Sequence, residues 1–308
     1  MAAAETLIVA RPHETWVAPV AELAAEHFSV AIATPQQLPD TSRVEVLIGA
    51  PPELQSVVAQ CPRLKWIQST WAGVDALLDS LRPGLAITPL KGVFGQSMGE
   101  FVLGWLLALE RNIIRRAVQR SWLAEVEAPI AGKRLGILGA GSIGSEVAKR
   151  AAVFGLEVTG LTVRGGDRPG FERCYTREAR LEFALGLDYL VSILPATPST
   201  DGFVDAELLS QLARGAIFIN AGRGNAVVEK DLIQALDQGQ LRYAVLDVFE
   251  EEPLPDSHGL WQIPGLFITS HTAAPTPDAA IPAVFQKNLR CYLAGEALPD
   301  AVQLDLGY

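Results

Sequence analysis

The sequence predicts an α/β protein with two domains, each a doubly wound parallel sheet covered by helices on both faces. Short β-rich runs alternate with helical stretches along most of the chain, which is the pattern of parallel sheets. One of these alternations carries a glycine fingerprint between a strand and a helix. The 308 residues suffice for two domains that each bury a core, and the 49% hydrophobic content and 27 glycines fit a soluble α/β enzyme.

The charge and the cysteine content indicate which kinds of partner the protein binds and in which cellular compartment it is expected. A formal net charge of −10 and a pI near 5.0 argue against nucleic-acid or anionic-membrane binding. The scattered cysteines, Cys61, Cys174 and Cys291, lack metal-ligand spacing, so we expect reduced thiols and no bound metal. The N-terminal segment lacks the basic and long apolar regions of a signal peptide, and the longest apolar stretch is far shorter than a membrane span. We therefore expect a cytoplasmic protein.

The first domain is predicted to comprise residues 1–92 plus 277–308. It carries no fingerprint glycines, so we do not expect it to bind a dinucleotide. The helical stretch at 277–294 follows the last strand of the second domain and is expected to return to the first, which makes this domain discontinuous. Strands are expected at 6–10, 29–33, 44–48, 64–68 and 86–88, and helices at 19–28 and 53–60.

The longest helical pattern spans residues 99–118. Its apolar residues recur at helical spacing, which predicts a buried core helix; a subunit interface is the alternative. These residues are Phe101, Val102, Trp105, Leu106, Leu109, Ile113 and Ile114.

The second domain, predicted over residues 93–276, is organised around Gly139-x-Gly141-x-x-Gly144. Gly139 allows the tight strand-to-helix turn, Gly141 lets the backbone approach a pyrophosphate, and Gly144 lets the helix pack close to the strand. The helix N-terminus then offers N–H groups to the phosphates. Six strands, the number of a full dinucleotide-binding sheet, are expected near 135–138, 157–163, 189–194, 216–220, 243–247 and 266–270.

Polar residues follow three of these strands at the carboxyl edge, where open parallel sheets bind ligands. Arg223 follows the strand at 216–220, Asp247 and Glu252 follow the next, and His271 follows the last. An arginine can hold a carboxylate and polarise the adjacent carbonyl, and a histidine can supply a proton as hydride arrives. A carboxylate beside that histidine would favour imidazolium, but chemistry alone does not choose among the three glutamates at 250–252.

Together these motifs resemble the D-isomer-specific 2-hydroxyacid dehydrogenase family, from about residue 71 to residue 271. Within it, residues 104–107 and 260–262 look most similar to bacterial glyoxylate/hydroxypyruvate reductases of the A type. Ser270 departs from the family pattern, in which a proline often precedes the histidine. The motifs are Gly73-Val-Asp75, Gly99-Glu-Phe-Val102, Gly139-Ala-Gly-Ser-Ile-Gly144, Leu194-Pro-Ala-Thr197, Asn220-Ala-Gly-Arg-Gly224, Asp247-Val-Phe-x-x-Glu252-Pro-Leu-Pro255 and His271.

The resemblance assigns a role to each site residue and implies a Rossmann-type dinucleotide-binding domain beside a smaller flavodoxin-like substrate domain. It implies that Arg223 binds substrate, that His271 is the acid/base and that Glu252 is its partner. It also implies that Asp247 holds the nicotinamide carboxamide and that Ala72 and Gly73 receive the substrate carboxylate. The cofactor contacts are then expected at Gly139, Gly141, Ser142, Ile143, Gly144, Thr162, Arg164, Leu194, Pro195, Thr197, Ala221, Gly222, Asp247 and His271.

The end of the second strand of this domain favours NADP(H). NAD-specific relatives place an acidic residue there to bind the ribose 2′-hydroxyl, whereas this chain has Thr162, with Arg164 two residues later. An arginine attracts a 2′-phosphate, which a carboxylate would repel. Asp167 could reach the ribose after a loop shift, so NAD(H) stays possible.

The resulting expectation is a homodimeric, NAD(P)H-dependent reductase of small 2-oxo acids such as glyoxylate or hydroxypyruvate. One alternative within the family is a dehydrogenase for another D-2-hydroxy acid such as 3-phosphoglycerate. Another, from a different functional class, is a dinucleotide-sensing binding protein or corepressor on the same fold.

Overall fold

The computed structural model describes residues 5–11, 13–122 and 124–303. The chain forms two compact units, here called unit 1 (Met1–Phe94 with Thr276–Tyr308) and unit 2 (Gly95–Pro275). The predicted division, at 92/93 and 276/277, lies a residue or two from these borders.

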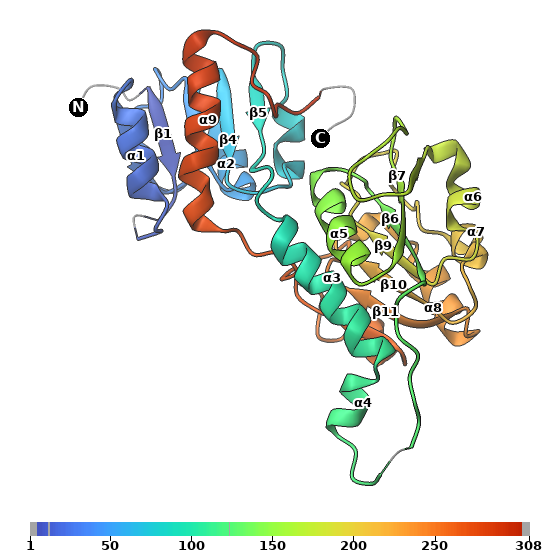
Figure 1. Ribbon diagram of the computed structural model, residues 1–308. Coiled ribbons are helices and arrows are strands. Elements are labelled where there is room, and N and C mark those ends of the chain that lie inside the picture. The colour runs from blue at the N-terminus through green and yellow to red at the C-terminus, as the bar shows by residue number, and fades with distance from the viewer. Residues whose placement is uncertain (1–4, 12, 123, 304–308) are drawn as a thin grey trace. The chain divides into compact units, whose positions relative to one another are not determined.

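Unit 1 contains a five-stranded parallel sheet in the order β2-β1-β3-β4-β5 (Figure 1). Neighbouring strands pair in register, for example Val9 with Gly49 and Gln68 with Thr88. The order reverses between β1 and β3, as in a doubly wound fold. The strands are β1 (Thr6–Val9), β2 (Val30–Ala33), β3 (Val46–Gly49), β4 (Trp66–Ser69) and β5 (Ala86–Thr88).

Helices cover both faces of this sheet. On one face, α2 (Pro51–Val58) and the 3₁₀ helix η1 (Asp75–Ser80) enclose a core of leucine, isoleucine and valine side chains. On the other, α1 (Val17–Ala25) packs beside α9 (Ile281–Ala294). Trp66 stacks there on Phe285 and Tyr292 of α9, with ring centroids 5.5 and 5.2 Å away. The chain's last helix is therefore part of the first unit.

Unit 2 contains a seven-stranded parallel sheet in the order β12-β11-β10-β9-β6-β7-β8. The order reverses between β6 and β9, which is the switch point where such sheets bind ligands. The strands are β6 (Arg134–Leu138), β7 (Glu157–Leu161), β8 (Arg173–Tyr175), β9 (Tyr189–Ser192), β10 (Ala216–Asn220), β11 (Leu241–Leu246) and β12 (Leu266–Ile268).

This sheet also lies between two helical layers. α3 (Gly95–Glu110) packs against α5 (Ser142–Val153) on one face, where both contribute to one hydrophobic core. The opposite core includes side chains of α6 (Arg180–Ala184), α7 (Ala206–Gln211) and α8 (Glu229–Asp237). Both faces of the central strands are thus buried, as expected for a parallel sheet.

Two predictions for unit 2 need correction. The sequence predicted six strands, but β8 adds a seventh at the sheet edge. The single helix predicted over 99–118 is two helices, α3 and α4 (Ile113–Ala117), separated by Asn112 in the left-handed conformation at φ 49°. Ile113 and Ile114 are exposed, so the predicted burial holds for α3 but is wrong for α4, which projects from the rest of unit 2 (Figure 1).

Within the described ranges, no helix is both long and apolar enough to span a bilayer.

Candidate functional site

Glycines bring together the loops that follow β6, β9 and β10 at the carboxyl edge of the unit 2 sheet. Gly139 has φ +98°, and a Cβ atom there would lie 2.7 Å from the carbonyl oxygen of Ile193. A Cβ atom on Gly222 would lie 2.5 Å from the backbone nitrogen of Leu194. Side chains at either position would separate loops that now touch through their backbones. The glycines therefore build one continuous surface at the switch point.

The fingerprint turn has the features that a pyrophosphate site needs. Gly144 lies against the carbonyl oxygen of Gly139, which leaves no room for a Cβ atom. Gly141 and Ser142 are exposed, and a Cβ atom on Gly141 would meet nothing within 4 Å. No side chain caps the N-terminus of α5, so its first N–H groups are available to an anion. The half-buried Ile143 follows in the same turn. These residues fit a dinucleotide.

The loop after β7 carries the residues predicted to choose the cofactor. The backbone N–H of Thr162 donates to the carbonyl of Tyr175 at 3.0 Å, which ties the loop to the edge strand β8. Arg164 is exposed directly beyond it, followed by two glycines with positive φ. The nearest acidic residue in the loop, Asp167, is also exposed.

The loop after β9 is held by its own hydroxyl groups. The Oγ1 of Thr200 donates to the carbonyl of Pro195 at 2.6 Å and accepts from the backbone N–H of Thr197 at 3.0 Å. Leu194 and Thr197 are buried. This fixes the turn that Gly139 and Gly222 approach.

Arg223 lies on the loop after β10, whose conformation is held by the buried side-chain amide of Asn220 and by close backbone contacts at Gly222 and Gly224. The Oδ1 of Asn220 accepts from the N–H of Gly222 at 3.2 Å, and its Nδ2 donates to the carbonyl of Arg223 at 2.9 Å. Ala221 and Gly222 are buried behind Arg223, and a Cβ atom on Gly224 would overlap the backbone of Phe249. The sequence interpretation assigned no role to Asn220, although a polar residue ending an apolar strand was the available signal.

His271 and Glu252 form a hydrogen-bonded pair at the same edge of the sheet. The Nδ1 of His271 lies 2.8 Å from Oε2 of Glu252, whose Oε1 accepts from the backbone N–H of Phe249 at 2.9 Å. Of the three consecutive glutamates, Glu252 is therefore the one placed beside the histidine. The Nε2 of His271 has no hydrogen-bond partner among the described residues, and the side chain is 51% exposed.

Asp247 is buried and holds the loop that carries His271. One carboxylate oxygen accepts from the hydroxyl of Thr269 at 2.6 Å and from the N–H of Thr272 at 2.8 Å. The other accepts from the N–H of Ala273 at 3.0 Å, and the backbone carbonyl of Asp247 accepts from the N–H of His271 at 2.7 Å. Its contact with a nicotinamide carboxamide stays a prediction.

Ala72 and Gly73 lie in unit 1, in the loop that follows β4. The Oγ of Ser69 both accepts from the N–H of Trp71 and donates to its carbonyl, each at 2.9 Å. Ala72 is exposed and Gly73 half-buried.

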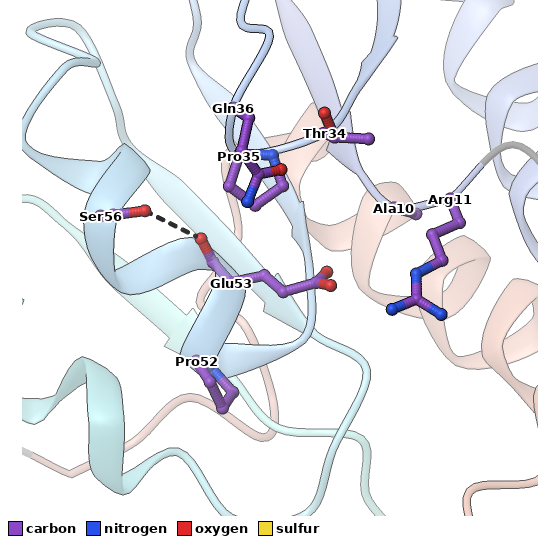
Figure 2. Close-up of a pocket in the computed structure, with 8 residues that line it drawn as sticks. All are labelled: Ala10, Arg11, Thr34, Pro35, Gln36, Pro52, Glu53 and Ser56. Atoms are coloured by element: carbon purple, nitrogen blue, oxygen red, sulfur yellow. Dashed lines mark hydrogen bonds between the residues drawn. The ribbon is translucent and has the colours of Figure 1, made fainter.

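A separate pocket of about 350 Å³ lies after β1, β2 and β3 of unit 1 (Figure 2). Figure 2 shows the side chains of Arg11 and Glu53 extending into the same space. Burial, with a smaller contribution from the charge of Glu14, raises the pKa of Glu53. None of the predicted site residues lines this pocket, which is therefore distinct from the candidate site.

Comparison with known proteins points to one family. Residues 103–273 match the family model described as D-isomer specific 2-hydroxyacid dehydrogenase, NAD binding domain. A glyoxylate/hydroxypyruvate reductase A of Serratia proteamaculans is 35% identical over 274 residues, which cover 85% of this chain and 87% of that protein.

Solved structures agree over almost the whole chain. A D-isomer specific 2-hydroxyacid dehydrogenase of Xanthobacter autotrophicus, in complex with NADPH and MES, has a TM-score of 0.87 and 33% identity, covering 99% of this chain and 100% of that one. An NADPH-dependent glyoxylate/hydroxypyruvate reductase of Sinorhizobium meliloti, in complex with NADP and sulfate, has a TM-score of 0.85 and 27% identity with the same coverage.

Proposed function

The chain belongs to the D-isomer-specific 2-hydroxyacid dehydrogenase family, and we propose that it reduces small 2-oxo acids such as glyoxylate and hydroxypyruvate with NADPH. Membership makes it an NAD(P)-dependent oxidoreductase similar to the A-type reductases. The observation that carries the specific proposal is the pair of His271 and Glu252 on the sheet edge that also presents the dinucleotide turn.

His271 is the proposed proton donor. The Oε2 of Glu252 accepts a hydrogen bond from Nδ1–H of His271. A protonated ring therefore presents its second proton at Nε2, the nitrogen without a partner among the described residues. The nicotinamide, when bound, supplies the hydride that turns the 2-oxo acid into an alkoxide, which needs this proton.

Arg223 and the backbone at Ala72 and Gly73 are the proposed carboxylate and carbonyl contacts of the substrate. A guanidinium can bind a carboxylate through two parallel hydrogen bonds and polarise the carbonyl beside it. Backbone N–H groups also bind anions without adding charge. The glycines beside Arg223 support this role because they fix its loop against neighbouring backbone.

NADPH is the proposed cofactor because the loop after β7 offers a cation instead of a carboxylate. Arg164 is exposed beyond Thr162, and Asp167 lies farther along the loop. Two of the similar solved structures were determined with NADPH or NADP. The proposed enzyme is a homodimer, supported by the apolar side chains that α4 exposes, and its predicted cytoplasmic location stays a prediction.

Steady-state reduction of a panel of 2-oxo acids, with NADPH and NADH in parallel, tests the proposal. We expect turnover of glyoxylate or hydroxypyruvate, with kcat/KM roughly 10- to 100-fold higher for NADPH, since a charge-assisted hydrogen bond contributes about 1.5–3 kcal/mol. His271→Ala should lower kcat by roughly 10²- to 10⁴-fold while NADPH binding is retained.

His27→Ala is the matched control, because this exposed histidine of unit 1 has no proposed role. Near-normal turnover in His271→Ala would remove that residue from the mechanism. NADPH binding without turnover of any 2-oxo acid would favour a dinucleotide-sensing protein instead, and a clear preference for NADH would contradict the cofactor proposal.

A further inference from the structure

The completely buried side chains of Gln68, Thr88 and Asn288 form a hydrogen-bonded network inside unit 1, which reaches the buried Ser69 through its backbone carbonyl. Gln68 and Ser69 belong to β4, Thr88 ends β5, and Asn288 lies in the middle of α9. Burying an amide costs free energy unless its hydrogen bonds are replaced. The surrounding side chains are mostly apolar, so an amide pair at this position calls for a structural reason.

The Gln68 amide is fully hydrogen bonded. Its Oε1 accepts from Nδ2 of Asn288 at 2.8 Å and from Oγ1 of Thr88 at 2.9 Å. Its Nε2 donates to the carbonyls of Ser69 at 2.9 Å and of Thr88 at 3.2 Å. The orientation of the last peptide of β4 is therefore fixed by a side chain that α9 holds in turn.

Aromatic packing keeps Asn288 in place. Phe285 and Tyr292 lie three residues before and four after it, so all three share one face of α9. Both rings stack on Trp66 of β4. The indole Nε1 of Trp66 also donates to the Oγ1 of Thr88 at 2.9 Å, which joins the ring to the network.

Ser69 extends the network to the loop after β4. Its hydroxyl bonds both the N–H and the carbonyl of Trp71, and that carbonyl also accepts from the N–H of Leu90 at 2.8 Å. Trp71 is thus held by its backbone directly before Ala72 and Gly73.

We propose that Gln68 and Asn288 are positioning residues that hold the Trp71–Gly73 loop in the conformation that binds the substrate carboxylate. The inference rests on the proposed function, in which the N–H groups of this loop receive that carboxylate. Such donors bind an anion well only when their directions are set in advance, because ordering them upon binding costs affinity.

Replacing both amides by leucine removes the support proposed for the loop. Asn288→Leu alone leaves Oε1 of Gln68 without one of its two donors, so the stability of this variant should fall. Gln68→Leu with Asn288→Leu removes the amide–amide bond from both sides, but it also leaves the carbonyls of Ser69 and Thr88 without the Nε2 donor, so we expect a loss of stability here too. We expect the double variant to raise KM for glyoxylate roughly tenfold, with kcat within about twofold of the parent and an unchanged Kd for NADPH.

Hydrogen exchange at residues 70–74, measured by mass spectrometry, gives a second readout that needs no turnover. Exchange should accelerate roughly tenfold in the double variant, because the Ser69–Trp71 turn loses its support. Thr6→Val is the matched control: it alters a buried polar side chain of β1, and KM and loop exchange should both stay parental. Asn288→Ala replaces the double variant if the latter does not fold.

Parental KM and parental exchange in a folded double variant would overturn the proposal. A parent chain that reduces no 2-oxo acid would instead overturn the proposed function. Exchange at residues 70–74 would then still decide whether the amide pair positions the loop.

Discussion

At the scale of single residues, unit 2 holds its proposed proton donor in a conformation that side chains rarely adopt. His271 has φ 53°, in the left-handed region, which costs a residue with a side chain about 1–2 kcal/mol. Hydrogen bonds from the N–H groups of His271, Thr272 and Ala273 to Asp247 offset this cost. Asp247, which directly follows β11, therefore fixes the backbone that places the imidazole beside Glu252.

Glu252→Gln tests the charge in this pair with little change of shape. The amide keeps an acceptor beside Nδ1 but replaces a charge-assisted hydrogen bond by a neutral one, which is roughly half as strong. The imidazole is then held less firmly, and we expect kcat for glyoxylate to fall roughly tenfold. The measurement is steady-state kcat and KM for glyoxylate at pH 7.

Glu251→Gln is the control for this variant, since Glu251 is exposed and has no contact with His271. Its kcat should match that of the parent. A parental kcat for Glu252→Gln, or a loss that appears only in Glu251→Gln, would show that the wrong carboxylate has been assigned.

At the scale of elements, the sequence located those strands and helices that have a clear local apolar pattern. Most strands of both sheets are rich in apolar residues, so the sequence located them to within a few residues. β8 was missed because its three residues, Arg173 to Tyr175, carry no apolar run and lie at an edge. The break before α4 was missed because the apolar spacing continues past Asn112, which adopts the left-handed conformation that asparagine tolerates and donates a hydrogen bond to Glu127.

Helix α7 supplies a stability prediction, because Asp205 caps it and also pairs with Arg180. Burial works against ionisation, but hydrogen bonds from Arg180 and the N–H of Leu208 outweigh it and hold the pKa of Asp205 below its usual value. Asp205→Ala should lower the free energy of unfolding of unit 2 by about 1–2 kcal/mol at pH 7. A carboxylate with a lowered pKa stabilises the fold above its unfolded pKa and loses that effect as pH falls through its folded pKa.

The difference between parent and Asp205→Ala should therefore shrink as pH falls below about 4, as measured by urea unfolding at several pH values. Glu207→Ala is the control, because Glu207 also contacts Arg180 but is 60% exposed; we expect less than about 0.5 kcal/mol. A pH-independent difference would mean that the effect of Asp205→Ala does not arise from its carboxylate charge.

At the scale of the whole molecule, the sequence predicted site residues that follow strands and missed those that support them. Arg223 and His271 stand in short motifs, so their chemistry could be inferred locally. Gln68 and Asn288 are 220 residues apart, and each looks like an ordinary polar residue until the fold brings α9 onto the first sheet. Positioning through buried amides is a property of tertiary structure that no local pattern reveals.

The arm formed by α4 with residues 118–122 and 124–130 is the proposed contact surface between two copies. Two of its arginines pair with two of its glutamates: Arg115 with Glu125 at 2.8 Å and Arg116 with Glu127 at 2.6 Å. Its apolar side chains instead point to solvent, with Val118 68% and Val126 95% exposed. A preformed segment with apolar groups outside is typical of an interaction surface. Ile113, Ile114 and Trp122 are exposed on the same arm.

Sedimentation velocity tests the proposed homodimer. The parent should sediment at twice the 33.0 kDa of one chain, because burying the apolar arm against a second copy is favourable. Val118→Asp with Val126→Asp places charges on this surface and should yield folded monomers, since both valines are exposed within one chain. Val153→Asp is the matched control, because this valine ends α5, lies outside the arm and is 86% exposed; it should stay dimeric. A monomeric parent would contradict the homodimer, and a double variant that remains dimeric would show that a surface other than the arm holds the two copies together.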